Sequence, residues 1–516
     1  ATRDGVDILL LSVGPNEPPE DTSTFLGAFD IFMLSAWRAG VFVAQAVGNN
    51  GPSPYSVVSY SPWTFGVASC RTDRKYPATL FLGDGRKVRG IGLSGSSWGD
   101  GMIQHKLVLA NDAAFPNATR NMEECQSPEA FDPAVVGGSV VICTFSAGFR
   151  SGTSNLRAVI QTAEALQFAG FVLVASPAYG DYVAQPIPFP VPGILIPRTT
   201  DAQVISDYYE EHTTTRRDGE GGIEFHGRAM IGDGRIASYE EEAPIVSRFS
   251  SRGPDFMDRN KTPVDILKPD ILAPGEQIWA AWSPMSATEK ILHGHNFALI
   301  SGTSMAAPHI AGIGATMKQK YPSWTPSMIA SALSTTASKH DNRGQPIMAQ
   351  GSDPFTTHPA APFGYGAGLV DPLRALDPGL IFSSGYEDYI GFLCSLPNTA
   401  AEEIRTATGG SCESASLTAA SDLNLPSVTV TALSGNRTTR RVVMNVADKP
   451  ETYVAGVNPP EGVEVGIDPA WFTVAPGETQ TLEIKLTATR PRDDFSFGEI
   501  VLTGNLNHIV RAPLSV

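Results

Sequence analysis

The sequence has no long apolar run and little positive charge. Its longest apolar stretch, residues 168–175, has the length of a strand, whereas a membrane-spanning helix needs about 18 apolar residues. The formal net charge of −16 at pH 7 argues against nucleic acid or an anionic membrane surface as a partner. We therefore predict a globular protein with no nucleic acid partner and no membrane partner.

The sequence also lacks an initiator methionine, a signal peptide and any group of carboxylates with the loop spacing of a calcium site. It opens with Ala1-Thr2-Arg3, so we expect an N-terminus that is processed or truncated. No pattern typical of a metal or cofactor site is found, and we predict neither.

Cysteine is scarce, and two of the cysteine pairs lie close in sequence. This spacing suits two local disulfides with one thiol left over, among Cys70, Cys125, Cys143, Cys394 and Cys412. Acceptor triplets for glycosylation begin at Asn117, Asn260 and Asn436, although Pro263 weakens the second. Cysteines and triplets together favour an extracellular protein.

Residues 300–309 read Ile-Ser-Gly-Thr-Ser-Met-Ala-Ala-Pro-His and are the most informative stretch. Apolar residues precede this stretch, and helix-forming residues follow it to about Lys320. The pattern predicts that Ser304 lies in the first turn of a helix, where unpaired N–H groups and the helix dipole stabilise developing negative charge. The alternative is a serine that only caps the helix.

This string resembles the nucleophile motif of the subtilisin-like serine proteases, the subtilases, and the resemblance implies that Ser304 is the nucleophile. Residues 48–52 read Gly-Asn-Asn-Gly-Pro and resemble the oxyanion segment of that family. The amide of Asn49 would then donate a hydrogen bond to the oxygen of the tetrahedral intermediate. Taken alone, the second string would indicate only an Asn-Gly turn.

The resemblance also implies where a substrate binds. An extended peptide would pair with residues 12–14 as an added strand, and residues 41–48 would form the opposite wall. Val47 stands where the family usually has alanine, which could reshape the adjacent pocket. The residues predicted to bind substrate are Ser12, Val13, Gly14, Ala46, Val47, Gly48 and Thr303.

Residues 8–14 and 41–46 are apolar runs that flank a helical segment, residues 24–39. Strand, helix and strand in this order predict the βαβ unit of a doubly wound parallel sheet, in an α/β fold. Short alternating strands near the C-terminus predict a β-sandwich.

Plant-type subtilases carry the same order of domains, and the resemblance covers essentially the whole chain. It implies a subtilisin-like domain that is truncated at its N-terminus and interrupted by a β-rich protease-associated insert, in which Cys125 and Cys143 are bridged. A fibronectin-III-like sandwich follows, with Cys394 and Cys412 near its start. The predicted boundaries are 1–101 and 236–377 for the catalytic domain, 102–235 for the insert and 378–516 for the sandwich.

The aspartate and histidine motifs that subtilases place before their serine are not found. His293-Gly294-His295 resembles the histidine motif only weakly. His309 lies on the predicted helix, about 140° around its axis from Ser304, and so points away from it. Asp270 follows a proline and is expected to fix a turn.

Three hypotheses follow. In the first, the chain is the C-terminal portion of a secreted plant serine endopeptidase, and an upstream segment of the same protease supplies the aspartate and the histidine. In the second, the chain is a truncated and nearly inert product. In the third, it is a non-enzymatic peptide-binding or scaffold protein. A protein or peptide substrate and the upstream segment are the predicted partners of the first.

Overall fold

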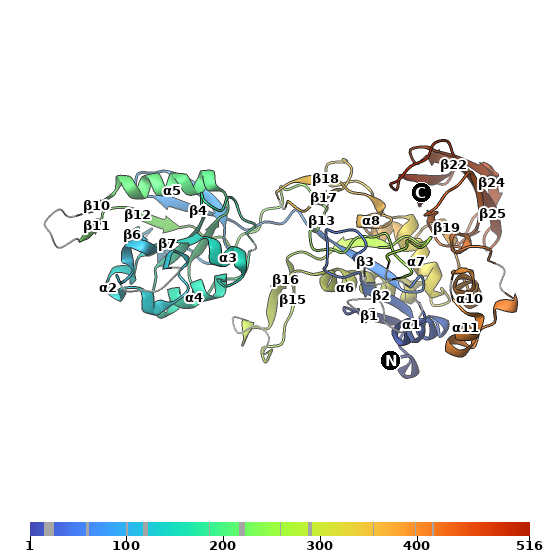
Figure 1. Ribbon diagram of the computed structural model, residues 1–516, viewed down its shortest axis with the longest axis horizontal. Coiled ribbons are helices and arrows are strands. Elements are labelled where there is room, and N and C mark those ends of the chain that lie inside the picture. Colours follow the sequence, from blue (N-terminus) through green and yellow to red (C-terminus); the bar gives the residue numbers. More distant parts are fainter. Residues whose placement is uncertain are drawn as a thin grey trace. The chain divides into compact units, whose positions relative to one another are not determined.

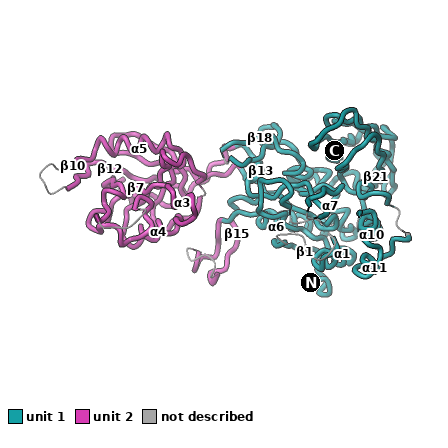
Figure 2. Tube along the Cα trace, viewed as in Figure 1, with its two compact units in different colours: residues 1–72, 242–278, 300–516 teal, residues 73–241, 279–299 magenta. Residues whose placement is uncertain are grey.

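The computed structural model describes residues 1–14, 25–57, 61–99, 102–116, 122–184, 186–215, 222–258, 260–286, 292–353, 355–397, 399–414 and 417–516 (Figure 1). The chain divides into two compact units (Figure 2). The first unit comprises residues 1–72, 242–278 and 300–516, and the second comprises residues 73–241 and 279–299.

A parallel sheet forms the centre of the first unit. Its parallel strands are β1 (Ile8–Leu11), β2 (Phe42–Ala46), β3 (Phe65–Arg71) and β14 (Ile271–Pro274), which pair in this order. β2 and β3 are buried almost throughout, as continuous apolar strands of a parallel sheet are when both faces are covered. β1 lies at the end of the sheet and is partly exposed.

Helices cover both faces of this sheet. α1 (Ala28–Arg38) packs with Val41 and Val43 on one face, and α6 (Thr303–Lys320) packs with Phe42 and Ala44 on the other. Successive strand residues point to opposite faces, so this alternation assigns one helical layer to each face. The arrangement is that of the doubly wound sheet expected from the sequence.

The same unit extends the sheet with short strands and holds further helices. β13 (Ile245–Val246) runs antiparallel to β3 and parallel to β17 (Met348–Gln350), which pairs with β18 (Thr357–Pro359). The remaining helices before the sandwich are α7 (Pro326–Thr335), α8 (Pro362–Tyr365) and α9 (Pro372–Ala375).

The second unit is built around a closed barrel. Its strands are β4 (Pro77–Leu82), β5 (Lys87–Ile91), β6 (His105–Leu109), β7 (Val140–Phe145), β8 (Gly170–Ala175), β9 (Gly193–Ile196) and β12 (Arg228–Ile231). Its helices are α2 (Pro133–Val136), α3 (Ala147–Ser151), α4 (Leu156–Ala165) and α5 (Thr199–Glu211). Two further two-stranded sheets lie outside the barrel. One pairs β10 (Thr213–Thr215) with β11 (Ile223–Phe225), and the other pairs β15 (Ile278–Ala281) with β16 (Phe297–Ile300).

The barrel begins earlier in the chain than the predicted boundary at residue 102. β4 and β5 are barrel strands, because β4 pairs with β12 and β5 pairs with β9. This hairpin alternates between buried and exposed residues, unlike the buried parallel strands before it. The boundary of the second unit is therefore at residue 73.

A two-sheet β-sandwich follows, as the alternating strands predict. One sheet contains β19 (Leu380–Phe382), β21 (Asn436–Asn445), β25 (Thr479–Ala488) and β23 (Val463–Asp468). The other contains β20 (Val428–Thr429), β27 (Ile509–Ser515), β26 (Phe497–Gly504), β22 (Glu451–Asn458) and β24 (Trp471–Val474). Every second residue of β25, such as Leu482 and Ile484, is buried in the core between the sheets.

A helical segment interrupts the sandwich after β19. It contains α10 (Tyr386–Ser395) and α11 (Ala401–Thr408), and Tyr389 packs edge-on against Trp37 and Trp63 of the sheet domain. The predicted sandwich, residues 378–516, therefore includes a helical part that packs on the sheet domain. The alternation of apolar and polar residues that predicts the strands does not indicate these helices, because their buried residues pack against the sheet domain.

His508 joins the end of the sheet domain to the sandwich. Its Nδ1 lies 2.5 Å from the Glu451 carboxylate and its Nε2 lies 3.1 Å from the carboxylate of Asp377, two residues after α9. Burial disfavours the charged imidazole, but the two carboxylates outweigh this and raise the pKa of His508 above its usual value. When it is protonated, His508 is a cation between two carboxylates at this junction.

Replacing His508 by asparagine should destabilise the protein by about 1.5–3 kcal/mol at pH 5.5, where the imidazolium bonds both acids. Because the folded-state pKa is raised, the stabilisation is complete below the unfolded value near 6.5 and is lost as the pH rises through the folded-state value. Denaturant unfolding at pH 5.5 and 8.5 measures this, with the exposed His358→Asn as the matched control. An equal loss of stability at both pH values would show that the charge of His508 does not stabilise the junction.

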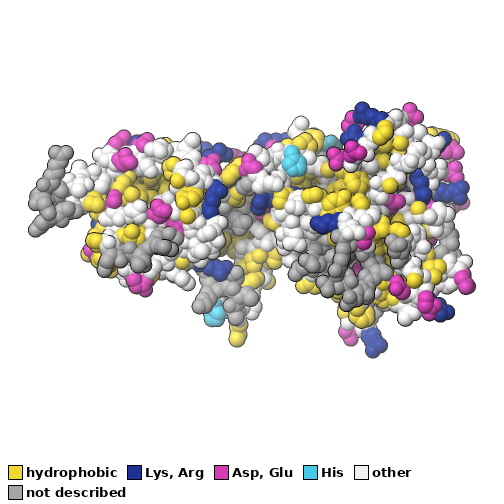
Figure 3. All heavy atoms as spheres, in the orientation of Figure 1, with side chains coloured by type: hydrophobic (Ala, Val, Ile, Leu, Met, Phe, Trp, Pro, Cys, Tyr) yellow, Lys and Arg dark blue, Asp and Glu magenta, His cyan; other side chains and the backbone are white. Residues whose placement is uncertain are grey.

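Charged side chains are distributed over the surface. On the face shown in Figure 3, acidic and basic groups are interspersed with apolar ones. Within the described ranges, no helix has both the length and the apolar character that a bilayer crossing requires.

Candidate active site

The site is built at the start of α6. Gly302 precedes the helix, Thr303 is its first residue and Ser304 is its second, so the hydroxyl lies among the N–H groups that have no partner within the helix. Ser304 is half-buried and Thr303 is fully buried. Because β1 and β2 run parallel, their carboxyl ends deliver residues 12–14 and 46–49 to this end of the sheet.

Ser12 holds the backbone of Ser304. Pro308 lies within α6 and has no N–H, so the carbonyl of Ser304 loses its partner in the helix. The hydroxyl of Ser12 donates to this carbonyl at 2.9 Å. In return, the hydroxyl of Ser304 donates to the carbonyl of Ser12 at 3.2 Å. A residue from the end of β1 thus fixes both the backbone and the side chain of Ser304.

Thr303 orients the side chain of Asn49. Its N–H and its hydroxyl both donate to Oδ1 of Asn49, each at 2.9 Å. Since a backbone N–H can only donate, these bonds identify the amide oxygen and leave Nδ2 as the outward group. A Cβ placed on Gly302 would lie 3.7 Å from this Nδ2, so the donor lies beside the turn that leads to Ser304.

The predicted nucleophile Ser304 and the predicted oxyanion donor Asn49 lie far apart in sequence. Thr303 links them in the structure, because it precedes Ser304 in the chain and bonds the side chain of Asn49. Asn49 is exposed and its Nδ2 is available to a ligand, while the start of α6 adds the positive end of a helix dipole. This arrangement can stabilise negative charge that develops on an oxygen bound next to Ser304.

Two predicted substrate-binding residues have other contacts in the structure. Val47 is fully buried and packs with Val57, Ala68 and Leu272, so its side chain faces the core and not an open pocket. Thr303 is equally buried and is a partner of Asn49. Val47 directly follows β2 and Thr303 opens α6, and a match to a sequence motif does not indicate that their side chains point inward.

The other predicted binding residues lie at the two sides of Ser304. Ser12, Val13 and Gly14 are exposed, and Gln45 Nε2 donates to the Val13 carbonyl at 3.3 Å. Ala46 is buried at the end of β2, and Gly48 follows with a φ of 105°, a conformation that favours glycine.

Comparison with known families identifies the family of this chain. The model of the subtilase family matches residues 1–368, which include Asn49, Thr303 and Ser304. This chain belongs to the subtilase family. A fibronectin type-III domain model matches residues 422–516, the main part of the sandwich.

Two curated relatives come from Arabidopsis thaliana. Subtilisin-like protease SBT2.4 is 56% identical over all of this subtilase chain and 62% of its own length, and subtilisin-like protease SBT2.5 is 44% identical over 100% and 63%. The chain thus spans less than two thirds of the relatives' length. The crystal structure of the psychrophilic subtilisin-like protease Apa1 from Pseudoalteromonas sp. AS-11 is 11% identical, with a TM-score of 0.28 over 73% of this chain and 71% of that one, which supports no further conclusion.

Among the described residues of this subtilase, no histidine accepts a hydrogen bond from Ser304. His309 bonds the carbonyl of Met305 within α6 at 2.9 Å, as its position on the helix suggested. His293 and His295 are exposed in the loop between β15 and β16 of the second unit. Within the described ranges, the hydroxyl of Ser304 thus donates to the carbonyl of Ser12 and to no histidine.

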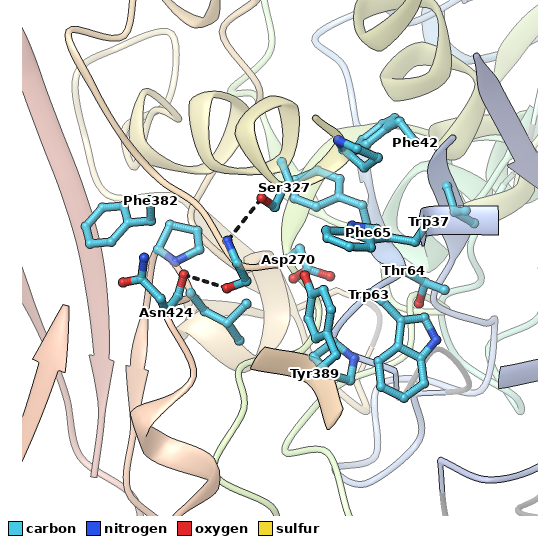
Figure 4. A pocket seen from close by; sticks show the side chains of 17 residues that line it. Trp37, Phe42, Trp63, Thr64, Phe65, Asp270, Ser327, Phe382, Tyr389 and Asn424 are labelled. Carbon is cyan, nitrogen blue, oxygen red and sulfur yellow. Dashed lines mark hydrogen bonds between the residues drawn. The ribbon is translucent and has the colours of Figure 1, made fainter. Parts of the chain in front are cut away.

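Asp270 is a structural carboxylate. Its Oδ2 accepts hydrogen bonds at 2.6 Å from the N–H of Gly66 and from Lys268 Nζ, which also donates to the carbonyl of Thr64. Burial raises the pKa of Asp270, an effect that Lys268 opposes. Figure 4 shows Asp270 beside the ring of Tyr389, at a cavity of about 30 Å³, which has room for about one water molecule and not for a peptide.

Cys70 packs in the same buried cluster as Val47, and the other four described cysteines form disulfides. Disulfides join Cys125 to Cys143 and Cys394 to Cys412, and Cys70 is a buried thiol whose pKa is raised by burial. Asn260 and Asn436 are exposed, whereas Asn117 lies outside the described residues. The described residues contain no group of His, Cys, Asp or Glu side chains that could hold a metal ion.

Proposed function

We propose that this chain is the C-terminal portion of a serine endopeptidase that hydrolyses peptide bonds through an acyl-enzyme at Ser304. The observation that supports this most directly is the pair of hydrogen bonds by which Thr303, the chain neighbour of Ser304, holds the side chain of Asn49. A serine nucleophile and an oxyanion donor at one helix start match the chemistry of acyl transfer and not that of a simple helix cap.

The proposed reaction uses these two residues together with a histidine from the upstream segment. Ser304 Oγ attacks the carbonyl carbon of the scissile bond as its proton passes to a histidine. The carbonyl oxygen becomes an oxyanion that accepts a hydrogen bond from Asn49 Nδ2. The C–N bond then breaks, the amine leaves with the proton from the histidine, and water hydrolyses the acyl-enzyme by the same route.

An upstream segment of the same protease would supply the histidine and the aspartate that orients it. Two observations support this part of the proposal. The relatives are longer than this chain, which spans 62% and 63% of two of them. β1 pairs with β2 on one side only among the described strands, which leaves a sheet edge beside Ser12 where a further strand could pair.

The substrate would be a protein or peptide in an extended conformation, bound along the exposed residues 12–14 as an added strand. The second unit corresponds in this proposal to the protease-associated insert of plant-type subtilases. We also propose a secreted glycoprotein of the plant cell wall, which the disulfides and the exposed Asn260 and Asn436 would suit.

The chain alone should be nearly inert, because its Ser304 has no base among the described residues. A serine-directed phosphonate probe tests this on residues 1–516 and on the full-length protease, which is this chain together with the upstream segment. We expect labelling that peptide mapping assigns to Ser304 in the full-length protein and only slow labelling of the chain alone. Equal labelling of both would refute the need for an upstream base, and labelling of neither would refute the protease assignment.

A further inference from the structure

Residues 247–253 form a strap along the oxyanion loop, residues 48–56. The N–H of Gly51 donates to the carbonyl of Phe249 at 2.8 Å, and the N–H of Ser56 donates to the carbonyl of Arg252 at 3.0 Å. A Cβ on Gly51 would lie 2.1 Å from the carbonyl oxygen of Ser250, so the two segments are in direct backbone contact. Only glycine fits at this crossing.

Hydrogen bonds attach the strap to strand β3, and a further hydrogen bond joins its two ends. The N–H of Ser247 donates to the carbonyl of Ser69 in β3 at 2.9 Å, and the N–H of Ser69 donates to Ser250 Oγ at 3.0 Å. The buried guanidinium of Arg252 donates to the carbonyls of Ser247 and Gln350. Burial lowers the pKa of Arg252 to about 10, so the group is still a cation at neutral pH. The strap is therefore a fixed support.

Ser251 makes two bonds to the oxyanion loop. Its N–H donates to the carbonyl of Gly48 at 3.0 Å, and its hydroxyl accepts from the N–H of Asn50 at 3.1 Å. These are the two peptide groups that flank Asn49. Because one residue holds both peptide planes, it restricts φ and ψ of Asn49, while Thr303 holds the end of its side chain. Ser251 itself is fully buried and cannot touch a substrate.

We propose that Ser251 is a positioning residue for the oxyanion hole, which aims Nδ2 of Asn49 by fixing the backbone on both sides of it. This inference rests on the proposed protease function. A donor contributes to catalysis only when it is held where the oxyanion forms, so a loosened Asn49 should stabilise the transition state less while substrate binding is unchanged.

The test is a double-mutant cycle between Ser251→Ala and Asn49→Leu in the full-length protease. We expect Ser251→Ala to lower kcat about 10-fold with KM within about twofold, the pattern of an interaction that matters in the transition state. In the Asn49→Leu background the same change should alter kcat by less than about twofold, because the group that it positions is gone. Equal losses of kcat in both backgrounds would show that Ser251 acts only on folding, and would overturn the inference.

A matched control is Ser97→Ala in the second unit, where the serine hydroxyl accepts from the N–H of Ile231 at 2.8 Å. It removes the same type of bond and should leave kcat unchanged. Amide hydrogen exchange of the full-length protein gives a readout that is independent of activity, since Asn50 should exchange about 10-fold faster in Ser251→Ala. Unchanged exchange at Asn50 would also overturn the inference. If the unmodified protease neither cleaves peptides nor labels at Ser304, the proposed function fails instead.

Discussion

Replacing Ser304 by alanine in the full-length protease should lower kcat by about 10⁶-fold, the size of loss known for removing the serine nucleophile of a subtilisin. The physical reason is that no acyl-enzyme can form without the hydroxyl, whereas the oxyanion hole and substrate binding remain. The residual rate should be about 10³–10⁴ above that in water. Initial rates on a peptide substrate measure the loss.

The control for this change is Thr316→Ala, which removes an exposed hydroxyl from the same helix at a distance from its start. We expect its kcat to equal that of the unmodified protease. Both variants should unfold at similar temperatures, because Ser304 is only half-buried and its hydroxyl makes a single hydrogen bond to Ser12. A Ser304→Ala protein that keeps a tenth of the activity would assign the nucleophile elsewhere.

Replacing Asn49 by leucine should lower kcat by about 10²–10³-fold, as removal of the asparagine donor does in a subtilisin, with little change in KM. The side chain keeps its approximate shape but no longer donates to the oxyanion. It also leaves the N–H and hydroxyl of Thr303 without their acceptor, so a modest loss of stability should accompany the loss of rate.

Asn50→Ala is the matched control for Asn49. The side chain of Asn50 is exposed, and its contact with the strap is made by its backbone N–H, which alanine retains. Its kcat should therefore be unchanged. If Asn49→Leu raised KM and left kcat intact, Asn49 would bind the ground state and would not act as an oxyanion donor.

The central parts of the fold and site could be predicted from the sequence because each has a local signal. The buried strands β2 and β3 are continuous apolar runs, and Ser304 and Asn49 each stand in a dense string of small residues. The parallel order of the strands then brings their carboxyl ends together without any further information.

Other parts could not be predicted because their determinants lie far apart in sequence. The inward direction of Val47 and the role of Thr303 depend on residues that are distant in sequence and pack against them. β4 and β5 form a local hairpin, but the pairs that assign it to the barrel are made with β12 and β9, which follow much later in the chain. The hydrogen bond from Asn50 to Ser251 spans 201 positions, and the local sequence around neither residue indicates its partner.

A crystal structure of the full-length protease with a peptidyl phosphonate bound is the most direct test. The account predicts a covalent bond to Ser304 Oγ, with Asn49 Nδ2 about 2.7–3.1 Å from the phosphonyl oxygen that mimics the oxyanion. A phosphonyl oxygen directed away from Asn49, or a probe attached to another residue, would contradict it.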